Sequence, residues 1–197
     1  MIKTFCISLP NRRDRREKVL ANCFRVGLKP IWINAVDGRD NQIGSVNGCK
    51  YSHWFCIKLA QHEHLDKFLV LEDDVEFSED FSLDLKDVPP DWDMIYFGGN
   101  HVNSEPVHVK NNVYKCGKTL CAHAIIIRHT CYDLLLQKLL EGDEPVDVLF
   151  AQLHEKDVNA YVIYPHTAWQ FGSFSDIEKR DVWYGYVKDW DMKLCNK

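Results

Sequence analysis

The chain has 197 residues, of which 46% are hydrophobic and 27% are charged, and this composition predicts one folded domain with a sizeable core. Its net charge of -5 disfavours binding to the phosphate backbone of a nucleic acid, and no apolar stretch is long enough to span a bilayer. Residues 1–9 are too few and too polar for a signal peptide, so we expect a cytoplasmic chain with eight reduced cysteines.

The first predicted strand, residues 2–9, leads into an arginine-rich helix start, and Asn11 is placed to cap that helix. The first turns of the helix carry Arg12, Arg13, Asp14, Arg15 and Arg16. Positive charges at a helix N-terminus oppose the helix dipole. We therefore expect one of these arginines to bind a phosphate or a carboxylate from a neighbouring loop, although a solvated basic face would explain each arginine taken singly.

A second predicted strand, residues 31–36, ends at Asp37-Gly38. An acid at the carboxyl end of a strand often reaches a ribose hydroxyl, but a turn aspartate needs no ligand to explain it. The helix that follows begins at Asn47, and Ser52 and His53 near its start are placed to contact a nucleotide. The alternative for His53 is a hydrogen-bonded structural histidine.

The cysteines form no CxxC pair, which argues against a structural zinc site. Cys49 and Cys56 share one helical face with Ser52 and His53, because these residues are three or four positions apart. We expect Cys6, Cys56 and Cys121 to be small core residues, the commonest environment of a free cysteine.

Residues 68–71 are four consecutive apolar residues, which predicts a strand buried on both faces in the middle of a parallel sheet. This strand ends in Glu72, Asp73 and Asp74, and alternation predicts that Glu72 and Asp74 share one side while Asp73 points to the other. Adjacent carboxylates repel one another, and Mg²⁺ or Mn²⁺ bound among them would relieve that repulsion. The alternative is a solvated acidic turn that starts the next helix.

The second half of the chain continues the alternation of strands and helices and predicts a single α/β layer fold. The predicted elements are a helix over residues 77–88, a strand over 93–97, a polar mobile loop over 100–112, a strand over 119–128, a helix over 131–140 capped by Thr130, a helix starting at 146 and a last strand over 160–164.

Asp147 lies in the first turn of the helix that starts at residue 146 and is the leading candidate for a general base, with Glu144 and Asp143 behind it. An acid that simply favours a helix N-terminus is the alternative. The C-terminal tail is dense in aromatic residues, most of which we expect to cover the sheet while one or two stack on a sugar. These are Trp169, Phe171, Phe174, Trp183, Tyr184, Tyr186 and Trp190.

Taken in order, these segments resemble glycosyltransferase family 25, which includes lipopolysaccharide sugar transferases and procollagen galactosyltransferases. The matching segments are Ile7-Ser8-Leu9 with the arginines from Arg12 to Arg16, Ala35-Val36-Asp37-Gly38, Gly48-Cys49 with Ser52-His53, Leu71-Glu72-Asp73-Asp74-Val75, Pro145-Val146-Asp147, Tyr164-Pro165 with Gln170, and Ser173-Phe174-Ser175-Asp176-Ile177. The chain departs from the family pattern at Ser45 and Val46, where Gly-Glu is usual, and at His123, where an aromatic is usual.

The resemblance implies a GT-A-type, Rossmann-like α/β fold in a single domain, residues 1–197, with a mostly parallel central sheet flanked by helices. Residues 1–100 would form the half that binds the nucleotide sugar, and residues 101–197 the half that binds the acceptor. It also implies a nucleoside-diphosphate sugar donor, UDP-sugar in our prediction, a glycan or glycoconjugate acceptor, Mn²⁺ or Mg²⁺, and inversion at the anomeric carbon.

Within that framework each candidate residue has an expected role. The metal ligands would be Glu72, Asp74 and His166, and the catalytic acids Asp147 and Glu144. The donor would be held by Leu9, Arg12, Arg15, Asp37, Ser52, His53 and Asp73. The main alternative is a non-catalytic sugar-nucleotide-binding or glycan-assembly module on the same fold.

Overall fold

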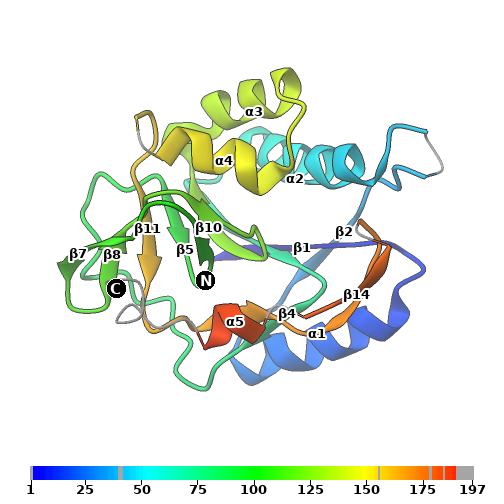
Figure 1. Cartoon of the computed structure of the whole chain (residues 1–197), viewed down its shortest axis with the longest axis horizontal. Coiled ribbons are helices and arrows are strands. Elements are labelled where there is room, and N and C mark those ends of the chain that lie inside the picture. Colours follow the sequence, from blue (N-terminus) through cyan, green and yellow to red (C-terminus); the bar gives the residue numbers. More distant parts are fainter. Residues whose placement is uncertain (1, 40–41, 155, 178, 184, 190–197) are drawn as a thin grey trace.

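A mixed sheet of eight strands runs through the molecule in the order β2-β1-β3-β10-β5-β11-β8-β7 (Figure 1). The computed structural model describes residues 2–39, 42–154, 156–177, 179–183 and 185–189. Strands β2, β1 and β3 are mutually parallel, β11 is parallel to β5, and the other neighbouring pairs are antiparallel. The strands are β1 (Lys3–Ser8), β2 (Ile31–Asn34), β3 (Lys67–Glu72), β5 (Met94–Tyr96), β7 (Val107–Lys110), β8 (Val113–Lys115), β10 (Ala124–Arg128) and β11 (Ala160–Ile163).

Helices cover both faces of this sheet, which confirms the predicted α/β fold. Figure 1 shows α2, α3 and α4 on one side and α1 with the short α5 on the other. The helices are α1 (Arg13–Arg25), α2 (Ser45–His62), α3 (Tyr132–Glu141), α4 (Val146–His154) and α5 (Gly185–Lys188), and the 3-10 helix η1 (His129–Cys131) precedes α3. None of the helices in the described ranges combines the length and apolar character that a membrane span requires.

Strand β3 is buried on both faces because its side chains alternate between two cores. Phe68 and Val70 belong to the core beneath α2, α3 and α4, whereas Leu69 and Leu71 belong to the core that includes α1. All four side chains are fully buried, and each contributes about 1.5–3 kcal/mol through the apolar surface it removes from water. The predicted strand with two buried faces is therefore confirmed, although only β1 is parallel to it and its other neighbour, β10, is antiparallel. Its carboxyl end delivers three acids to the edge of the sheet.

Three two-stranded sheets lie outside the main sheet. They pair β4 (Val75–Phe77) with β12 (Ala168–Gln170), β13 (Ser173–Ser175) with β14 (Arg180–Val182), and β6 (Asn100–His101) with β9 (Thr119–Leu120). The first follows directly from β3, and because Val75 pairs with Gln170 it brings the C-terminal part of the chain next to the acids.

Several predicted local structures are wrong. The expected helix over 77–88 does not form, because Phe77 in β4 pairs with Ala168 in β12 and the sixteen residues before β5 are turns and irregular chain. The expected strand over 119–128 is divided into β9 and β10 at Cys121, which has a φ of 74°. The expected loop over 100–112 contains β6 and β7, so it is not wholly irregular.

The predicted helix caps are also wrong. Arg12, rather than Asn11, occupies the N-cap of α1, and it makes no side-chain capping hydrogen bond. Thr130 lies inside η1, and its hydroxyl donates a hydrogen bond to Asp93 instead of to the helix backbone.

Candidate functional site

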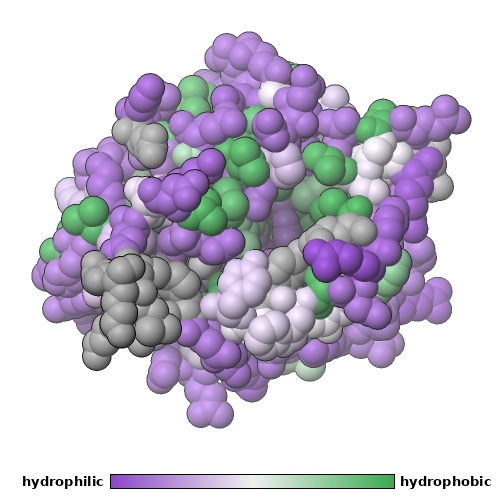
Figure 2. Space-filling view, viewed as in Figure 1, coloured by the Kyte–Doolittle hydropathy of each residue, from purple (hydrophilic) through white to green (hydrophobic). Residues whose placement is uncertain are grey.

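A cavity of about 460 Å³ opens at the carboxyl ends of β1, β2 and β3. Ligand crevices in open α/β sheets lie at this position. Its walls come from the ends of these strands, the first turns of α2 and α4, and the β13–β14 region. Figure 2 shows a hollow on this face of the molecule, with apolar side chains beside it. Its lining includes Leu9, Arg15, Asp37, Cys49, Ser52, Glu72, Asp73, Asp74, Cys121, Asp147, Gln170 and Asp176.

The three acids at the carboxyl end of β3 all line this cavity, but their side chains contact different partners from those predicted. Glu72 Oε1 lies 3.0 Å from His53 Nε2 on α2, whereas Asp73 Oδ1 accepts a hydrogen bond of 2.7 Å from Arg15 on α1. Asp74 also lies on the Arg15 side, 3.5 Å from its guanidinium, and accepts hydrogen bonds from Gln170. The strand ends at Glu72, so the alternation that predicted a shared side for Glu72 and Asp74 stops before Asp74.

The electrostatics of the three acids follow from these partners. Burial together with the negative charge of Glu72 raises the pKa of Asp74 to about 7. Burial also raises the pKa of Asp73, although Arg15 opposes the shift. Burial acts in the same direction on Glu72, but the hydrogen bond and charge of His53 outweigh it and lower the pKa of Glu72. Without a further cation, Asp74 is therefore the acid that is hardest to keep ionised.

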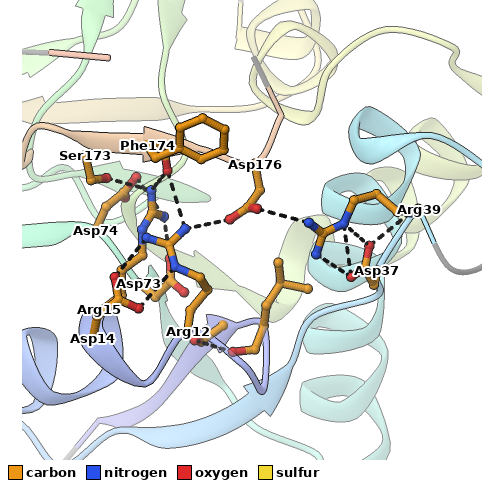
Figure 3. A network of polar contacts seen from close by, with 12 residues as sticks. Arg12, Asp14, Arg15, Asp37, Arg39, Asp73, Asp74, Ser173, Phe174 and Asp176 are labelled. Atoms are coloured by element: carbon orange, nitrogen blue, oxygen red, sulfur yellow. Dashed lines mark hydrogen bonds and ion pairs between the residues drawn. The ribbon is translucent and has the colours of Figure 1, made fainter. Parts of the chain in front are cut away.

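Arginines from two segments connect the elements at the edge of the cavity through hydrogen bonds and ion pairs (Figure 3). Besides Asp73, Arg15 donates hydrogen bonds to Ser173 Oγ at 2.6 Å and to the Phe174 carbonyl at 2.8 Å. Arg12 and Arg39 both contact Asp176, at 2.6 and 3.4 Å. The prediction that an arginine of the helix start binds a carboxylate from a neighbouring loop is thus confirmed.

Arg15→Gln is expected to lower the free energy of unfolding by about 3–5 kcal/mol, because it leaves the buried Asp73 carboxylate without its cation. The Arg15 and Asp73 side chains are only 9% and 11% exposed. Urea denaturation followed by circular dichroism measures the loss. Arg13→Gln, at an exposed position two residues earlier in the same helix, serves as the matched control and should change stability by less than about 0.5 kcal/mol. Equal losses in the two variants would contradict a structural role for the Arg15–Asp73 pair.

Asp147 lines the cavity from the first turn of α4, and backbone amides fix its carboxylate. Asp147 Oδ2 accepts a hydrogen bond of 3.1 Å from the Cys121 amide, and Oδ1 accepts one of 2.9 Å from the Val148 amide. Glu144, the second predicted catalytic acid, is exposed and does not contribute to the cavity lining. Asp143 is likewise exposed and outside the lining, so the structure brings one of the three candidate bases to the same cavity as the acids.

The predicted donor-binding residues occupy different positions. Leu9, Arg15, Asp37, Ser52 and Asp73 line the cavity, whereas Arg12 is engaged with Asp14 and Asp176 beside it and His53 is fully buried behind Glu72.

The Ser52 hydroxyl forms hydrogen bonds with two backbone groups of the protein. Its hydroxyl donates to the Gly48 carbonyl at 2.7 Å and accepts from the Val36 amide at 2.8 Å. A side chain at Gly48 would come within 2.5 Å of the Val36 carbonyl oxygen. The Gly48–Ser52 turn thus permits α2 to approach the end of β2 closely.

His166, the third predicted metal ligand, does not line the cavity. Its Nδ1 donates to the Val187 carbonyl at 2.7 Å, and its Nε2 lies 3.2 Å from Nε2 of His101. The strand order explains this separation, because His166 follows β11, which lies three strand positions from β3 in the sheet. The structure therefore does not place His166 in the cavity with Glu72 and Asp74.

Sequence reasoning also missed residues of the cavity. Arg39 and Cys49 were not assigned to the site, and Cys121, expected in the core, is half-buried on the cavity wall. Cys6 and Cys56 are buried as predicted. The shared helical face of Cys49 and His53 was the available signal for Cys49, whereas the backbone turn at Cys121 has no comparable signal in the sequence.

The aromatic tail divides into two groups. Trp169 and Phe171 are buried, in keeping with the prediction that the tail covers the sheet, while Phe174, Trp183 and Tyr186 are 46%, 69% and 42% exposed. Tyr184 and Trp190 lie outside the described residues.

Comparison with known proteins supports the family resemblance. No family model matches the chain. Procollagen galactosyltransferase 2 of Mus musculus is 26% identical over 250 residues, which cover 95% of this chain and 39% of that protein. The Homo sapiens protein named inactive glycosyltransferase 25 family member 3 is 30% identical over 135 residues, 52% of this chain and 22% of that protein. The chain thus spans about two fifths of the length of the procollagen galactosyltransferase it matches.

Solved structures show a shared fold. A glycosyltransferase involved in glycosylation of the major capsid of PBCV-1 superposes with a TM-score of 0.53 at 12% identity, covering 83% of this chain and 82% of that chain. A197 from STIV gives 0.51 at 13% identity, covering 93% and 94%. Drosophila β-1,4-galactosyltransferase 7, in complex with manganese, UDP-Gal and xylobiose, gives 0.50 at 11% identity, covering 100% and 80%. These matches confirm the predicted GT-A-type fold.

Proposed function

We propose that this chain, which resembles glycosyltransferase family 25, is a metal-dependent, inverting glycosyltransferase. It would move a hexose from a nucleoside-diphosphate sugar, specifically a UDP-sugar, to a hydroxyl of a glycan, glycolipid or glycoprotein. The observation that carries the proposal is one cavity, at the carboxyl ends of parallel strands, lined both by the acids after β3 and by Asp147. Such a cavity provides separate groups for the diphosphate and for the acceptor hydroxyl.

Asp74 and Glu72 would hold the divalent cation. Carboxylate oxygens are the donor type that Mg²⁺ and Mn²⁺ prefer, and Asp74 is buried with a pKa raised to about 7, so a cation beside it would stabilise its ionised form. Among the described residues, Arg15 is the one cationic side chain that has a nitrogen within 4 Å of an Asp74 oxygen. The contact of Arg15 with Asp73 is shorter. When bound, a divalent cation supplies a Lewis acid that stabilises the charge developing on the leaving diphosphate.

The remaining steps fall to side chains of the chain itself. Asp147 accepts the proton of the acceptor hydroxyl as that oxygen attacks, and the amides of Cys121 and Val148 hold its carboxylate in position. Asp37, at the end of β2, lies where a ribose hydroxyl would enter, and Arg39 orients its carboxylate through a 2.6 Å ion pair. Ser52 would support that loop from α2, because its hydroxyl is already bonded to the Val36 amide.

A non-catalytic nucleotide-sugar-binding module is the second candidate. It is favoured by the similarity of the chain to family members named as inactive. The presence of Asp147 together with Glu72 and Asp74 favours the transferase. Hydrolysis of a radiolabelled nucleotide sugar separates the two, since a binding module releases no labelled sugar.

A screen of nucleotide sugars by thermal shift tests donor binding directly. A ligand present at about 100 times its Kd stabilises the native state by about 2.7 kcal/mol, which for a chain of this length raises Tm by about 5–10 °C. We expect this rise with a UDP-sugar and Mn²⁺ together, and a much smaller rise when EDTA replaces the metal. A screen in which no nucleotide sugar raises Tm, or in which Mn²⁺ makes no difference, would overturn the proposal.

A further inference from the structure

We propose that the chain has a second metal site at this cavity. The site would bind Zn²⁺ through the Cys49 thiol, the His53 imidazole and the Glu72 carboxylate. The three side chains each offer one ligand atom, and these atoms lie within 4.8 Å of one another. The site differs in chemistry from the oxygen ligands of Glu72 and Asp74, and it shares only Glu72 with them.

The fold assembles this site from two neighbouring elements. Cys49 and His53 are four residues apart on α2, so their side chains lie one above the other on the same helix face. Glu72 is the last residue of β3, and its Oε1 lies 3.0 Å from His53 Nε2. The cluster therefore depends on how α2 packs beside the central strand, and the sequence spacing alone gives only two of its three members.

One of the three ligand separations is close to what a tetrahedral ion requires, and all three are within 4.8 Å. Ligands about 2.0–2.1 Å from zinc at tetrahedral angles are separated by about 3.3 Å, near the 3.0 Å that separates His53 Nε2 and Glu72 Oε1. Nε2 is the ring nitrogen that lies next to Glu72, so metal binding there would place the ring proton on Nδ1, which is buried and has no hydrogen-bond partner among the described residues. Cys49 and Glu72 line the cavity, so a fourth position can be filled from the cavity side by water or by a ligand.

The mixed ligand set selects the metal. Thiolate and imidazole ligands favour Zn²⁺, whereas Mg²⁺ and Mn²⁺ favour sets made of oxygen alone. Zinc bound at this cluster also occupies Glu72 and would hinder a cation that needs Glu72 and Asp74. That consequence rests on the proposed function, whereas zinc binding itself does not depend on any transferase activity.

Cobalt absorption spectroscopy on the intact chain tests the site without an activity assay. We expect Co²⁺ to produce a thiolate-to-cobalt charge-transfer band in the near ultraviolet that saturates at one equivalent, that Zn²⁺ removes and that Mg²⁺ leaves in place. Cys49→Ser should abolish the band and weaken zinc binding by at least about 100-fold, because a hydroxyl is a much poorer ligand for this metal. Glu72→Gln should keep the band and weaken Co²⁺ binding by at least about tenfold, because it replaces a charged carboxylate ligand by a neutral amide.

Cys121→Ser is the matched control, because Cys121 is also a half-buried cysteine on the cavity wall. This variant should keep both the band and the zinc affinity. All variants carry Cys195→Ser, so that a thiol outside the described residues does not contribute to the spectrum. A band that survives in Cys49→Ser, or its absence in the parent chain, would overturn the proposal.

A second measurement needs no substitution at the site and covers the case in which Cys49→Ser fails to fold. Alkylation of the parent chain, followed by mass spectrometry of its peptides, reports the reaction rate of each cysteine separately. Zinc is expected to slow alkylation of Cys49 at least about tenfold and to leave the rate at Cys121 unchanged, since a metal-bound thiolate is shielded from the reagent. Equal rates at Cys49 with and without zinc would contradict the site.

Discussion

Asp147→Asn is expected to reduce the turnover number for sugar transfer by about 10²- to 10⁴-fold, the contribution typical of a positioned general base. The variant retains the size of the side chain but has no group that can accept the proton of the acceptor hydroxyl. Binding of the donor should be nearly unchanged, within about twofold of the parent Kd, because the proposed role of Asp147 lies in the chemical step. Steady-state kinetics and calorimetric titration with the donor measure the two quantities separately.

The structure sharpens this experiment through the two amides that hold Asp147. An asparagine can still accept one of these hydrogen bonds through its oxygen, but its amide nitrogen must then face the other donor, the Cys121 or Val148 amide. A modest loss of stability is therefore expected, and a thermal melt shows whether the variant is folded at the assay temperature.

Glu144→Gln completes the comparison. Glu144 is exposed and outside the cavity, so this variant should transfer sugar at a rate within about twofold of the parent. If Asp147→Asn keeps its activity and Glu144→Gln loses it, the base is Glu144 and a conformational change must bring it to the acceptor.

Much of the fold follows from the sequence because burial alone determines it. The four apolar residues from Phe68 to Leu71 specify a strand with a core on each side, and the acids after them must then lie at the edge of the sheet. The helix expected over residues 77–88 does not form, and the reason is a long-range pairing. Phe77 pairs with Ala168, ninety-one residues later, and no local pattern contains that information.

The site shows the same division between local and long-range information. Arginines at a helix start interact unfavourably with the helix dipole, which predicts that one of them binds an acid. Arg15 does bind Asp73. The direction of Asp74 could not be predicted, because it depends on where β3 stops. The position of His166 depends on the order of strands in the sheet, which places β10 and β5 between β3 and β11.

Removal of metal is expected to stop transfer completely: EDTA should abolish activity, and added Mn²⁺ should restore it in the parent chain but not in Asp74→Asn. Asparagine is neutral and is a weaker ligand than a carboxylate for a hard cation. Asp80→Asn, at an exposed acid in the segment that follows β4, is the matched control and should respond to EDTA and Mn²⁺ as the parent does. Full activity in EDTA would show that the acids do not serve a metal.

Stability gives a second readout of Asp74 that does not depend on turnover. Burial and the charge of Glu72 raise the pKa of Asp74 to about 7, above the ordinary value of 3.8, so ionised Asp74 destabilises the metal-free fold. The penalty develops as pH rises from the unfolded pKa and is complete above the folded pKa. In EDTA at pH 8, Asp74→Asn should therefore unfold at a higher urea concentration than the parent, and the difference should shrink toward pH 4.

Manganese should reverse that order, because it binds the ionised carboxylate of the parent and has no such ligand in Asp74→Asn. At pH 8 the parent then becomes the more stable of the two proteins, and its Tm rises with Mn²⁺ concentration while that of the variant stays constant. Equal stabilisation of both proteins by Mn²⁺ would place the cation away from Asp74, and the diphosphate would then have to be bound elsewhere in the cavity.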